Sequence, residues 1–119
     1  MFKPCVLIPV YNHEHAISAV VRAVLAHDLP CILVDDGSCA SCALVLDQLA
    51  VASPSQITLL RHDINRGKGG AMMTGFCHAA DAGYSHVLQI DADGQHNVAD
   101  IPRFLAQSAS KPAAVIAGY

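Results

Sequence analysis

The sequence lacks the features that mark several common classes of protein. It contains no tryptophan, only 5% aromatic residues and only 14% charged residues, while 53% of its 119 residues are hydrophobic. This composition excludes an intrinsically disordered chain and indicates one small domain with a dense core. No apolar run reaches the roughly 18 residues that a membrane-spanning helix requires. A signal peptide is not expected, because the opening Met1-Phe2-Lys3-Pro4 leads into a strand-like run without a small-residue cleavage site.

Basic clusters and paired cysteine motifs are also missing. The net charge is −3 and no stripe of lysine or arginine is present, so we expect no nucleic acid partner. Cys5, Cys31 and Cys77 fall in apolar segments and are expected to pack as small hydrophobic residues. Cys39 and Cys42 have the spacing of zinc ligands or redox cysteines, but no second cysteine pair or suitable histidine pair follows. A metal or redox role for this pair is therefore not expected.

Three phosphate-binding signatures are absent. There is no Gly-x₄-Gly-Lys-Ser/Thr loop, which excludes the standard nucleoside-triphosphatase loop. No Gly-x-Gly-x-x-Gly follows the first apolar run, which argues against a standard dinucleotide-binding fold. The same position also lacks the Gly-x-Gly-x-Arg loop expected of a nucleotidyltransferase that makes sugar nucleotides.

What the sequence does have is a strict alternation of strand and helix patterns. Short apolar runs predict strands at 5–10, 31–34, 57–60, 86–90 and 113–117. Helical spacing predicts helices at 15–27, 41–52 and 70–82, with Asn12 as the cap of the first and Gly83 as the stop of the third. Asp100 is the predicted cap of a fourth helix that has Pro102 in its first turn. This alternation predicts an α/β fold, with a doubly wound, mostly parallel sheet covered by helices on both faces.

Polar clusters follow four of the predicted strands. The clusters are Pro9–Glu14, Asp35–Ser38, Asn65–Ala71 and Asp91–Asp93. The carboxyl ends of parallel strands lie at one edge of the sheet, where ligands bind at the point of strand-order reversal. Four such clusters at one edge favour a ligand site over a set of unrelated surface turns.

The acidic pair Asp91 and Asp93 is the most informative of these clusters. In an extended chain residues two apart point to the same side, and two carboxylates in a poorly solvated crevice need a cation or a proton. Hard divalent ions such as Mg²⁺ or Mn²⁺ prefer such oxygen ligands and bridge them to phosphates. The alternative is an acidic turn that caps the next helix. Of the seven histidines, only His96 follows the pair closely; the others show no ligand spacing and are expected to be solvated or structural.

Two further clusters have more than one interpretation. The glycines around Lys68 could let backbone N–H groups and the lysine bind an anion at a helix start, or form only a flexible turn. Asp35 and Asp36 could accept hydrogen bonds from a ribose or a base. For Asp35, an Asp-Gly turn with Ser38 or Ser41 as a helix cap is equally consistent with the sequence.

Together the four clusters resemble the nucleotide-binding half of a family 2 inverting glycosyltransferase with the Rossmann-like GT-A fold. The motifs that carry the resemblance are Ile8-Pro9-Val10-Tyr11-Asn12, Val34-Asp35-Asp36-Gly37-Ser38, Asn65-Arg66-Gly67-Lys68-Gly69-Gly70-Ala71 and Asp91-Ala92-Asp93-Gly94-Gln95-His96. Their order and spacing are similar to those of the dolichyl- or polyprenyl-phosphate sugar synthase branch, which acts in cell envelope biosynthesis and related pathways.

The resemblance implies a role for individual residues. Its nucleotide-binding set is Pro9, Tyr11, Glu14, Asp36, Lys68, Asp91 and Ala92. Its metal set for Mg²⁺ or Mn²⁺ is Asp91, Asp93 and Gln95, in which Asp93 is the expected direct ligand. The catalytic residues are unknown and are expected beyond Tyr119.

The resemblance also implies an activity and a place in the cell. A UDP- or GDP-sugar would donate its sugar, with inversion, to a polyprenyl phosphate or to another lipid or saccharide acceptor. We expect a cytoplasmic protein, peripheral at the cytoplasmic face of the membrane. Residues 1–119 correspond to the donor-binding half, so we expect donor binding without turnover by this chain alone, and self-association through an exposed sheet edge. The alternatives are a non-catalytic nucleotide- or metal-binding module and a purely structural α/β domain.

Overall fold

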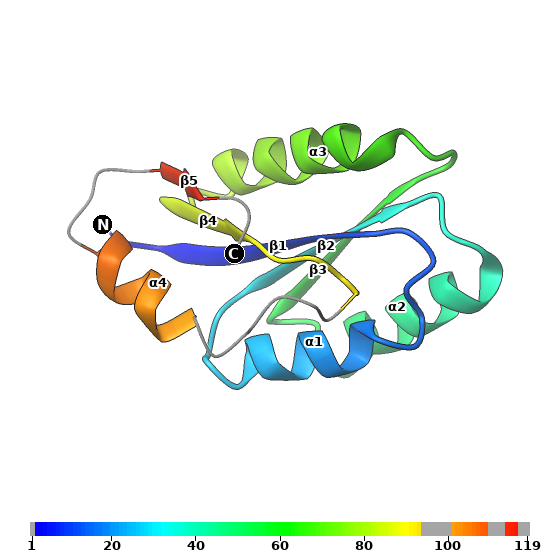
Figure 1. The fold of residues 1–119 in the computed structure, drawn as a ribbon, viewed down its shortest axis with the longest axis horizontal. Coiled ribbons are helices and arrows are strands. Elements are labelled where there is room, and N and C mark those ends of the chain that lie inside the picture. Colours follow the sequence, from blue (N-terminus) through cyan, green and yellow to red (C-terminus); the bar gives the residue numbers. More distant parts are fainter. Residues whose placement is uncertain (1, 94–100, 110–113, 117–119) are drawn as a thin grey trace.

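The computed structural model has three layers, with one sheet between two layers of helices (Figure 1). It describes residues 2–93, 101–109 and 114–116. In chain order the elements are β1 (Pro4–Val10), α1 (Ile17–Leu25), β2 (Cys31–Asp36), α2 (Ala40–Ala52), β3 (Ile57–His62), α3 (Gly67–Asp81), β4 (His86–Gln89), α4 (Ile101–Ser108) and β5 (Ala114–Ile116).

The sheet is parallel, and its strand order is β3-β2-β1-β4-β5. The chain moves from β1 outward to β3, then crosses to the other side of β1 and continues through β4 to β5. The order therefore reverses between β1 and β4, which is the arrangement of a doubly wound sheet. The predicted fold class is confirmed. β3 and β5 form the two edges of this sheet, and self-association through an edge stays a prediction.

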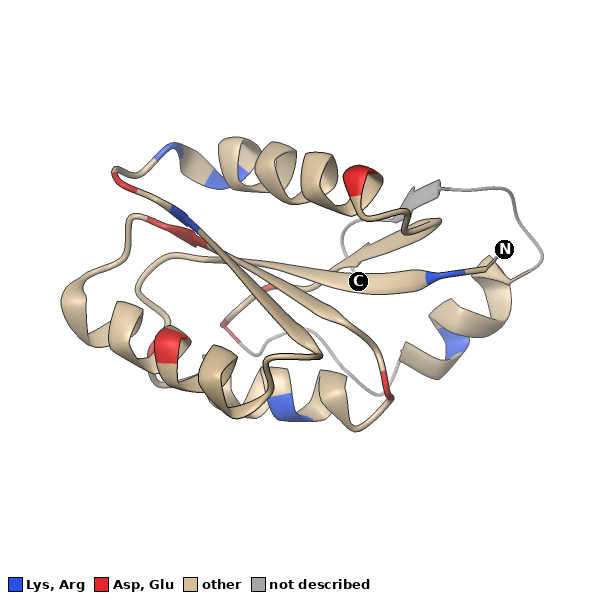
Figure 2. Ribbon diagram, turned by 180° about the vertical axis from the view of Figure 1, so that it is seen from behind, with Lys and Arg blue, Asp and Glu red and all other residues tan. Residues whose placement is uncertain are grey.

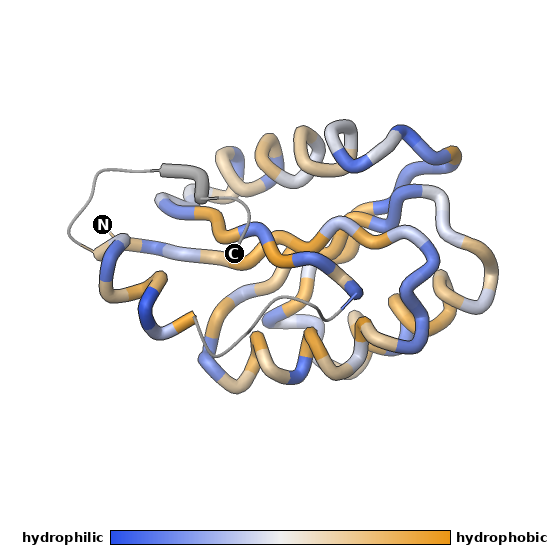
Figure 3. The backbone as a smooth tube through the Cα atoms, viewed as in Figure 1, coloured by the Kyte–Doolittle hydropathy of each residue, from blue (hydrophilic) through white to orange (hydrophobic). Residues whose placement is uncertain are grey.

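The core has one part on each face of the sheet. Side chains of β1 alternate between them: Val6 and Ile8 belong to the cluster that includes residues of α1, α2 and α4, whereas Leu7 belongs to the cluster that includes α3. A Cβ atom at Gly75 of α3 would collide with the Leu7 side chain, so the glycine allows α3 to lie close against β1. Figure 3 shows the hydrophobic strands and the hydrophilic segments that follow β1 and β3.

The first predicted helix cap is wrong. Asn12 has a left-handed backbone (φ 59°), and its Oδ1 accepts a hydrogen bond from Cys39 N at 2.7 Å, at the start of α2. Helix α1 begins later than predicted, after Ala16, which has no side-chain cap hydrogen bond. Asn12 therefore joins the loop after β1 to the loop after β2. The predicted cap Asp100 lies outside the described residues.

The other boundaries differ by a few residues from those predicted. β2 and β3 each extend two residues further, and α3 begins at Gly67, three residues earlier than its periodicity indicated. Gly83 has φ +84° just after α3, which confirms the predicted left-handed stop. None of the helices in the part of the chain that the structure describes is both long and apolar enough to cross a membrane.

The expectation for the cysteines is confirmed at two of three positions. Cys5 and Cys31 are buried, but Cys77 is exposed. The buried stripe of α3 is Ala71, Gly75 and Ala79. Because each residue advances a helix by about 100°, Cys77 lies on the side of α3 away from the sheet.

Candidate functional site

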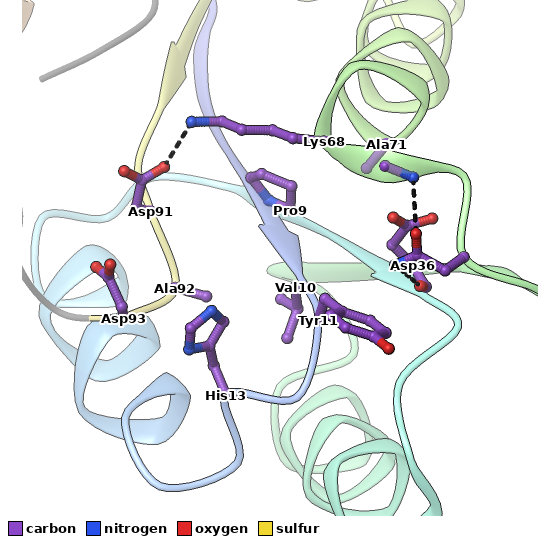
Figure 4. A pocket seen from close by; sticks show the side chains of 12 residues that line it. Pro9, Val10, Tyr11, His13, Asp36, Lys68, Ala71, Asp91, Ala92 and Asp93 are labelled. Carbon is purple, nitrogen blue, oxygen red and sulfur yellow. Dashed lines mark hydrogen bonds and ion pairs between the residues drawn. The ribbon is translucent and has the colours of Figure 1, made fainter.

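A pocket of about 460 Å³ opens at the carboxyl end of the sheet (Figure 4). Its walls come from the ends of β1, β2 and β4 and from the start of α3. The lining residues are Pro9, Val10, Tyr11, His13, Asp36, Asn65, Gly67, Lys68, Ala71, Asp91, Ala92 and Asp93. It therefore includes the point between β1 and β4 at which the strand order reverses, where such sheets bind ligands.

Most of the predicted nucleotide-binding residues meet in this pocket. Pro9, Tyr11, Asp36, Lys68, Asp91 and Ala92 all line it. Glu14 does not: its Oε2 accepts a hydrogen bond from Ser41 Oγ at 2.6 Å and contacts Cys39 Sγ at 3.4 Å. The hydrogen bond from Ser41 is the main reason that the pKa of Glu14 lies below its usual range. Glu14 thus connects the loop after β1 to the start of α2, and its contact with a nucleoside stays a prediction.

Asp36 is a buried carboxylate at the end of β2. Its Oδ1 accepts hydrogen bonds from His62 Nδ1 and from the backbone N–H of Arg66, both at 2.8 Å. Burial alone would raise the pKa of Asp36, but the hydrogen bonds from His62 and from the backbone at Arg66 outweigh it and lower the pKa. Asp36 is therefore a fixed anion on the wall of the pocket.

The side chain of Asp35 has different partners from that of Asp36. Its Oδ1 accepts a hydrogen bond from Ser38 N at 2.9 Å, and its Oδ2 pairs with Arg61 Nε at 2.8 Å. Arg61 also pairs with Asp47 on α2 at 3.1 Å. Figure 2 shows charged residues gathered where β2, β3 and the start of α3 meet. Asp35 therefore makes the contacts of a turn residue, and Asp36 is the residue that reaches the pocket. The predicted helix cap at Ser38 or Ser41 is wrong, because the N-cap of α2 is Cys39, without a side-chain cap hydrogen bond.

Gly37 lets the loops after β2 and β3 pack closely together. It has φ +75°, and a Cβ atom there would lie 2.6 Å from the backbone N of Asn65. Asn65 Nδ2 donates to the carbonyl oxygen of Asp36 at 3.2 Å, and Asn65 Oδ1 accepts from Gly67 N at 3.1 Å. The small residue at position 37 thus places Asn65 and the start of α3 beside Asp36.

Asp91 and Asp93 lie beyond the end of β4. The strand ends at Gln89, one residue before its predicted end and before both carboxylates, so strand alternation does not set their directions. Both carboxylates nevertheless line the pocket. Asp91 Oδ1 accepts hydrogen bonds from Gln89 Nε2 at 2.6 Å and from Lys68 Nζ at 3.1 Å.

The carboxylates of this pair fit a hard divalent cation. Two oxygen-donor side chains line a pocket beside a lysine, which is the composition expected of a site that also holds phosphate. Among the described residues, no group of three or more histidine, cysteine or acidic side chains is placed to hold a metal ion. A bound cation would therefore need ligands in addition to the carboxylates of Asp91 and Asp93. The predicted ligand Gln95 lies outside the described residues.

The sequence did not single out His13, Asn65 or His62. His13 and Asn65 line the pocket. His62 is buried and forms a hydrogen bond with the Asp36 carboxylate. His13 stands inside the cluster after β1, and Asn65 opens the glycine-rich cluster, so their positions carried a signal. His62 lies at the end of an apolar strand, where the sequence gives no sign of a functional role. Its contact with Asp36 depends on the pairing of β2 with β3.

Comparison with known proteins identifies the family. The family model described as Glycosyl transferase family 2 matches residues 5–119. The chain belongs to this family. It is 33% identical over 106 residues to a polyprenol monophosphomannose synthase of Mycolicibacterium smegmatis, covering 87% of this chain and 40% of that protein. It is 31% identical over 112 residues to an undecaprenyl-phosphate 4-deoxy-4-formamido-L-arabinose transferase of Klebsiella pneumoniae, covering 89% of this chain and 33% of that protein.

A solved structure agrees with this assignment. The fold is similar to that of a mannosyltransferase from Pyrobaculum calidifontis in complex with GDP-mannose and Mn²⁺, with a TM-score of 0.67 and 25% identity. The match covers 76% of this chain and 27% of that one. The chain of this family 2 member thus spans less than half the length of the relatives it matches.

Proposed function

We propose that this family 2 chain forms the donor-binding half of a metal-dependent glycosyltransferase that uses a nucleotide-sugar. The proposal depends mainly on one observation: Asp36, Lys68 and the Asp91–Asp93 pair, from three separate parts of the sequence, line a single pocket. The Asp36 carboxylate can accept hydrogen bonds from a nucleoside, and the Lys68 ammonium can pair with a diphosphate. The carboxylates of Asp91 and Asp93 are suitable ligands for a divalent cation.

The nucleoside would lie between the loop after β1 and the end of β2. Tyr11 is 48% exposed at the pocket and offers an aromatic face to a base. The ionised Asp36 can accept from a ribose hydroxyl or a base N–H. Pro9 also lines the pocket.

The diphosphate would lie at the start of α3. The first turn of this helix carries Lys68 and no acidic side chain. The helix start therefore favours an anion, and Lys68 can move from Asp91 to a phosphate oxygen.

Asp91 and Asp93 would hold Mg²⁺ or Mn²⁺ next to the diphosphate. When bound, the cation supplies charge neutralisation for the leaving diphosphate. Lys68 would stabilise the same developing charge. An acceptor oxygen that attacks the anomeric carbon from the face opposite the diphosphate gives inversion. A phosphate acceptor is already anionic and needs no general base to remove a proton.

The acceptor in this proposal is a polyprenyl phosphate, as in the names of the two curated relatives. Such a lipid would place the reaction at the cytoplasmic face of a membrane, with the protein bound peripherally. The acceptor-binding residues would lie outside the pocket described here, which is the donor half of the site.

Thermal unfolding tests donor binding directly. GDP, UDP and GDP-mannose are each added with and without MnCl₂, because a ligand that binds the native state raises the unfolding midpoint. We expect at least one nucleotide to raise the midpoint, and the shift to increase with Mn²⁺. No shift with any of them would contradict donor binding. Transfer of labelled sugar to a polyprenyl phosphate by the full-length protein separates a transferase from a non-catalytic nucleotide-binding module.

A further inference from the structure

His62 links the pocket to the body of helix α3. It is 5% exposed at the end of β3, and its Nδ1 lies 2.8 Å from Asp36 Oδ1. Its Nε2 lies 2.8 Å from Thr74 Oγ1, in the second turn of α3. The pairing of β2 with β3 places Asp36 directly beside His62, so the three side chains form one line across β2, β3 and α3.

The carboxylate of Asp36 determines which ring nitrogen of His62 carries the hydrogen. An ionised Asp36 can only accept, so His62 Nδ1 must donate to it. In the neutral ring Nε2 is then an acceptor, and the Thr74 hydroxyl can donate to it. One tautomer of the imidazole therefore satisfies both ring nitrogens without a buried unpaired group.

This arrangement restrains the carboxylate that faces the pocket. The hydrogen bonds from His62 and from the Arg66 backbone both end on Oδ1 of Asp36, and neither uses Oδ2. Two donors on one oxygen oppose rotation of the carboxylate. A side chain of similar size without the Nδ1 donor would remove one of these two hydrogen bonds and weaken the restraint on the carboxylate.

We propose that His62 is a positioning residue for the nucleoside: it holds Asp36 in the orientation that binds base or ribose, and Thr74 holds the imidazole ring in place through its other nitrogen. The inference rests on the proposed function, in which Asp36 contacts the nucleoside. His62 itself does not line the pocket.

Three variants test this role: His62→Leu, His62→Asn and Thr74→Val. Isothermal titration calorimetry measures their affinity for GDP, UDP and inorganic diphosphate, each with MnCl₂. We expect His62→Leu to weaken binding of the better nucleotide about tenfold, the loss expected for a charge-assisted hydrogen bond, without changing the affinity for inorganic diphosphate. The side-chain N–H₂ of asparagine can take the place of Nδ1–H, so His62→Asn should recover most of the loss.

The possible outcomes separate the inference from the proposed function. If the unaltered protein binds inorganic diphosphate but neither nucleotide, the proposed function fails. If it binds a nucleotide and folded His62→Leu binds it equally well, only the positioning role fails. An equal loss for nucleotide and inorganic diphosphate would also overturn that role, because it would show general damage to the pocket.

Nuclear magnetic resonance provides a second test that needs no variant at position 62. Long-range ¹H–¹⁵N spectra of the unaltered protein should show His62 as the Nδ1–H tautomer, and Thr74→Val should change that signal. An Nε2–H tautomer in the unaltered protein would overturn the inference.

Discussion

Lys68 Nζ lies 3.1 Å from Asp91 Oδ1, so a cation at the start of α3 already contacts the first carboxylate of the Asp-x-Asp pair. The two side chains are 61% and 32% exposed, and an ion pair this accessible to water adds little to stability. The ion pair is important because both residues line the pocket. In the proposed function, Lys68 would exchange its carboxylate partner for the diphosphate of a donor.

Removing the Lys68 charge should weaken donor binding without unfolding the protein. For Lys68→Met we expect about tenfold lower affinity for a nucleoside diphosphate with Mn²⁺, because one charge-assisted contact to phosphate is lost. The unfolding midpoint should change little. Calorimetry and thermal unfolding measure the two effects. Lys3→Met is the matched control: Lys3 contacts Ala82 and Tyr84, away from the pocket, and its loss should leave affinity unchanged.

The acidic pair should carry the Mn²⁺ dependence of nucleotide binding. In Asp91→Asn with Asp93→Asn, the extra stabilisation that Mn²⁺ gives to the nucleotide complex should disappear, because neutral amides bind hard cations poorly. Thermal unfolding with and without MnCl₂ measures this. Asp81→Asn, at the exposed end of α3, is the control and should retain the effect. A full Mn²⁺ effect in the double variant would disprove the metal assignment.

Gly37 should be needed for stability. Gly37→Ala combines an unfavourable φ of +75° with a Cβ atom 2.6 Å from Asn65 N, and should lower the free energy of unfolding by roughly 2–4 kcal/mol. Gly69→Ala, where a Cβ atom meets nothing within 4 Å inside α3, should instead stabilise by about 0.5–1 kcal/mol. Urea denaturation compares the two variants. Equal effects would mean that the close approach of the two loops is absent in solution.

The contribution of Asp36 to stability should depend on pH. Its pKa is lower in the folded state than in the unfolded chain, where it is about 3.9. The ionised group therefore stabilises the fold above that value, and the benefit is lost as pH falls through the lowered pKa. The stability difference between the unaltered protein and Asp36→Asn should be largest near neutral pH and should narrow below about pH 4. Urea denaturation at several pH values measures this stability difference. A difference that does not change with pH would contradict an ionised Asp36.

The cysteines should differ in reactivity. Cys39 and Cys77 are exposed, whereas Cys5, Cys31 and Cys42 are buried. Burial also raises the pKa of Cys5 to about 12, which keeps its thiol protonated. Native protein treated with iodoacetamide should therefore carry adducts at the two exposed positions, and denatured protein at all five. Mass spectrometry of the peptides would show whether a buried cysteine reacts in the native state.

The sequence predicted the architecture because each strand contains a short, mostly apolar run and polar clusters follow four of the five predicted strands. These local patterns are enough to indicate a doubly wound sheet and the edge at which ligands bind. The ends of elements were less predictable. β2 continues through Asp35 and Asp36 because both are paired in the ladder with β3, and a charged residue at the end of a strand gives no local sign of that pairing.

Side-chain partnerships account for most of what the sequence could not supply. Asn12 has the chemistry of a cap for the next helix, yet it serves α2, because its positive φ turns it toward Cys39. His62 supports Asp36 across neighbouring strands, and Glu14 contacts Ser41 instead of lining the pocket. All three depend on contacts between residues 26 or 27 positions apart in the chain, which no local pattern contains.

The hydrogen bonds of Asn12 have an evolutionary consequence. Its backbone N–H binds Ser38 Oγ at 3.1 Å while its side chain binds Cys39 N, so the turns after β1 and β2 share their anchors. An insertion in either turn would break the anchors of the other. Related proteins that change the length of one turn should therefore carry a compensating change in the second, and the two turns should diverge as a single inherited unit.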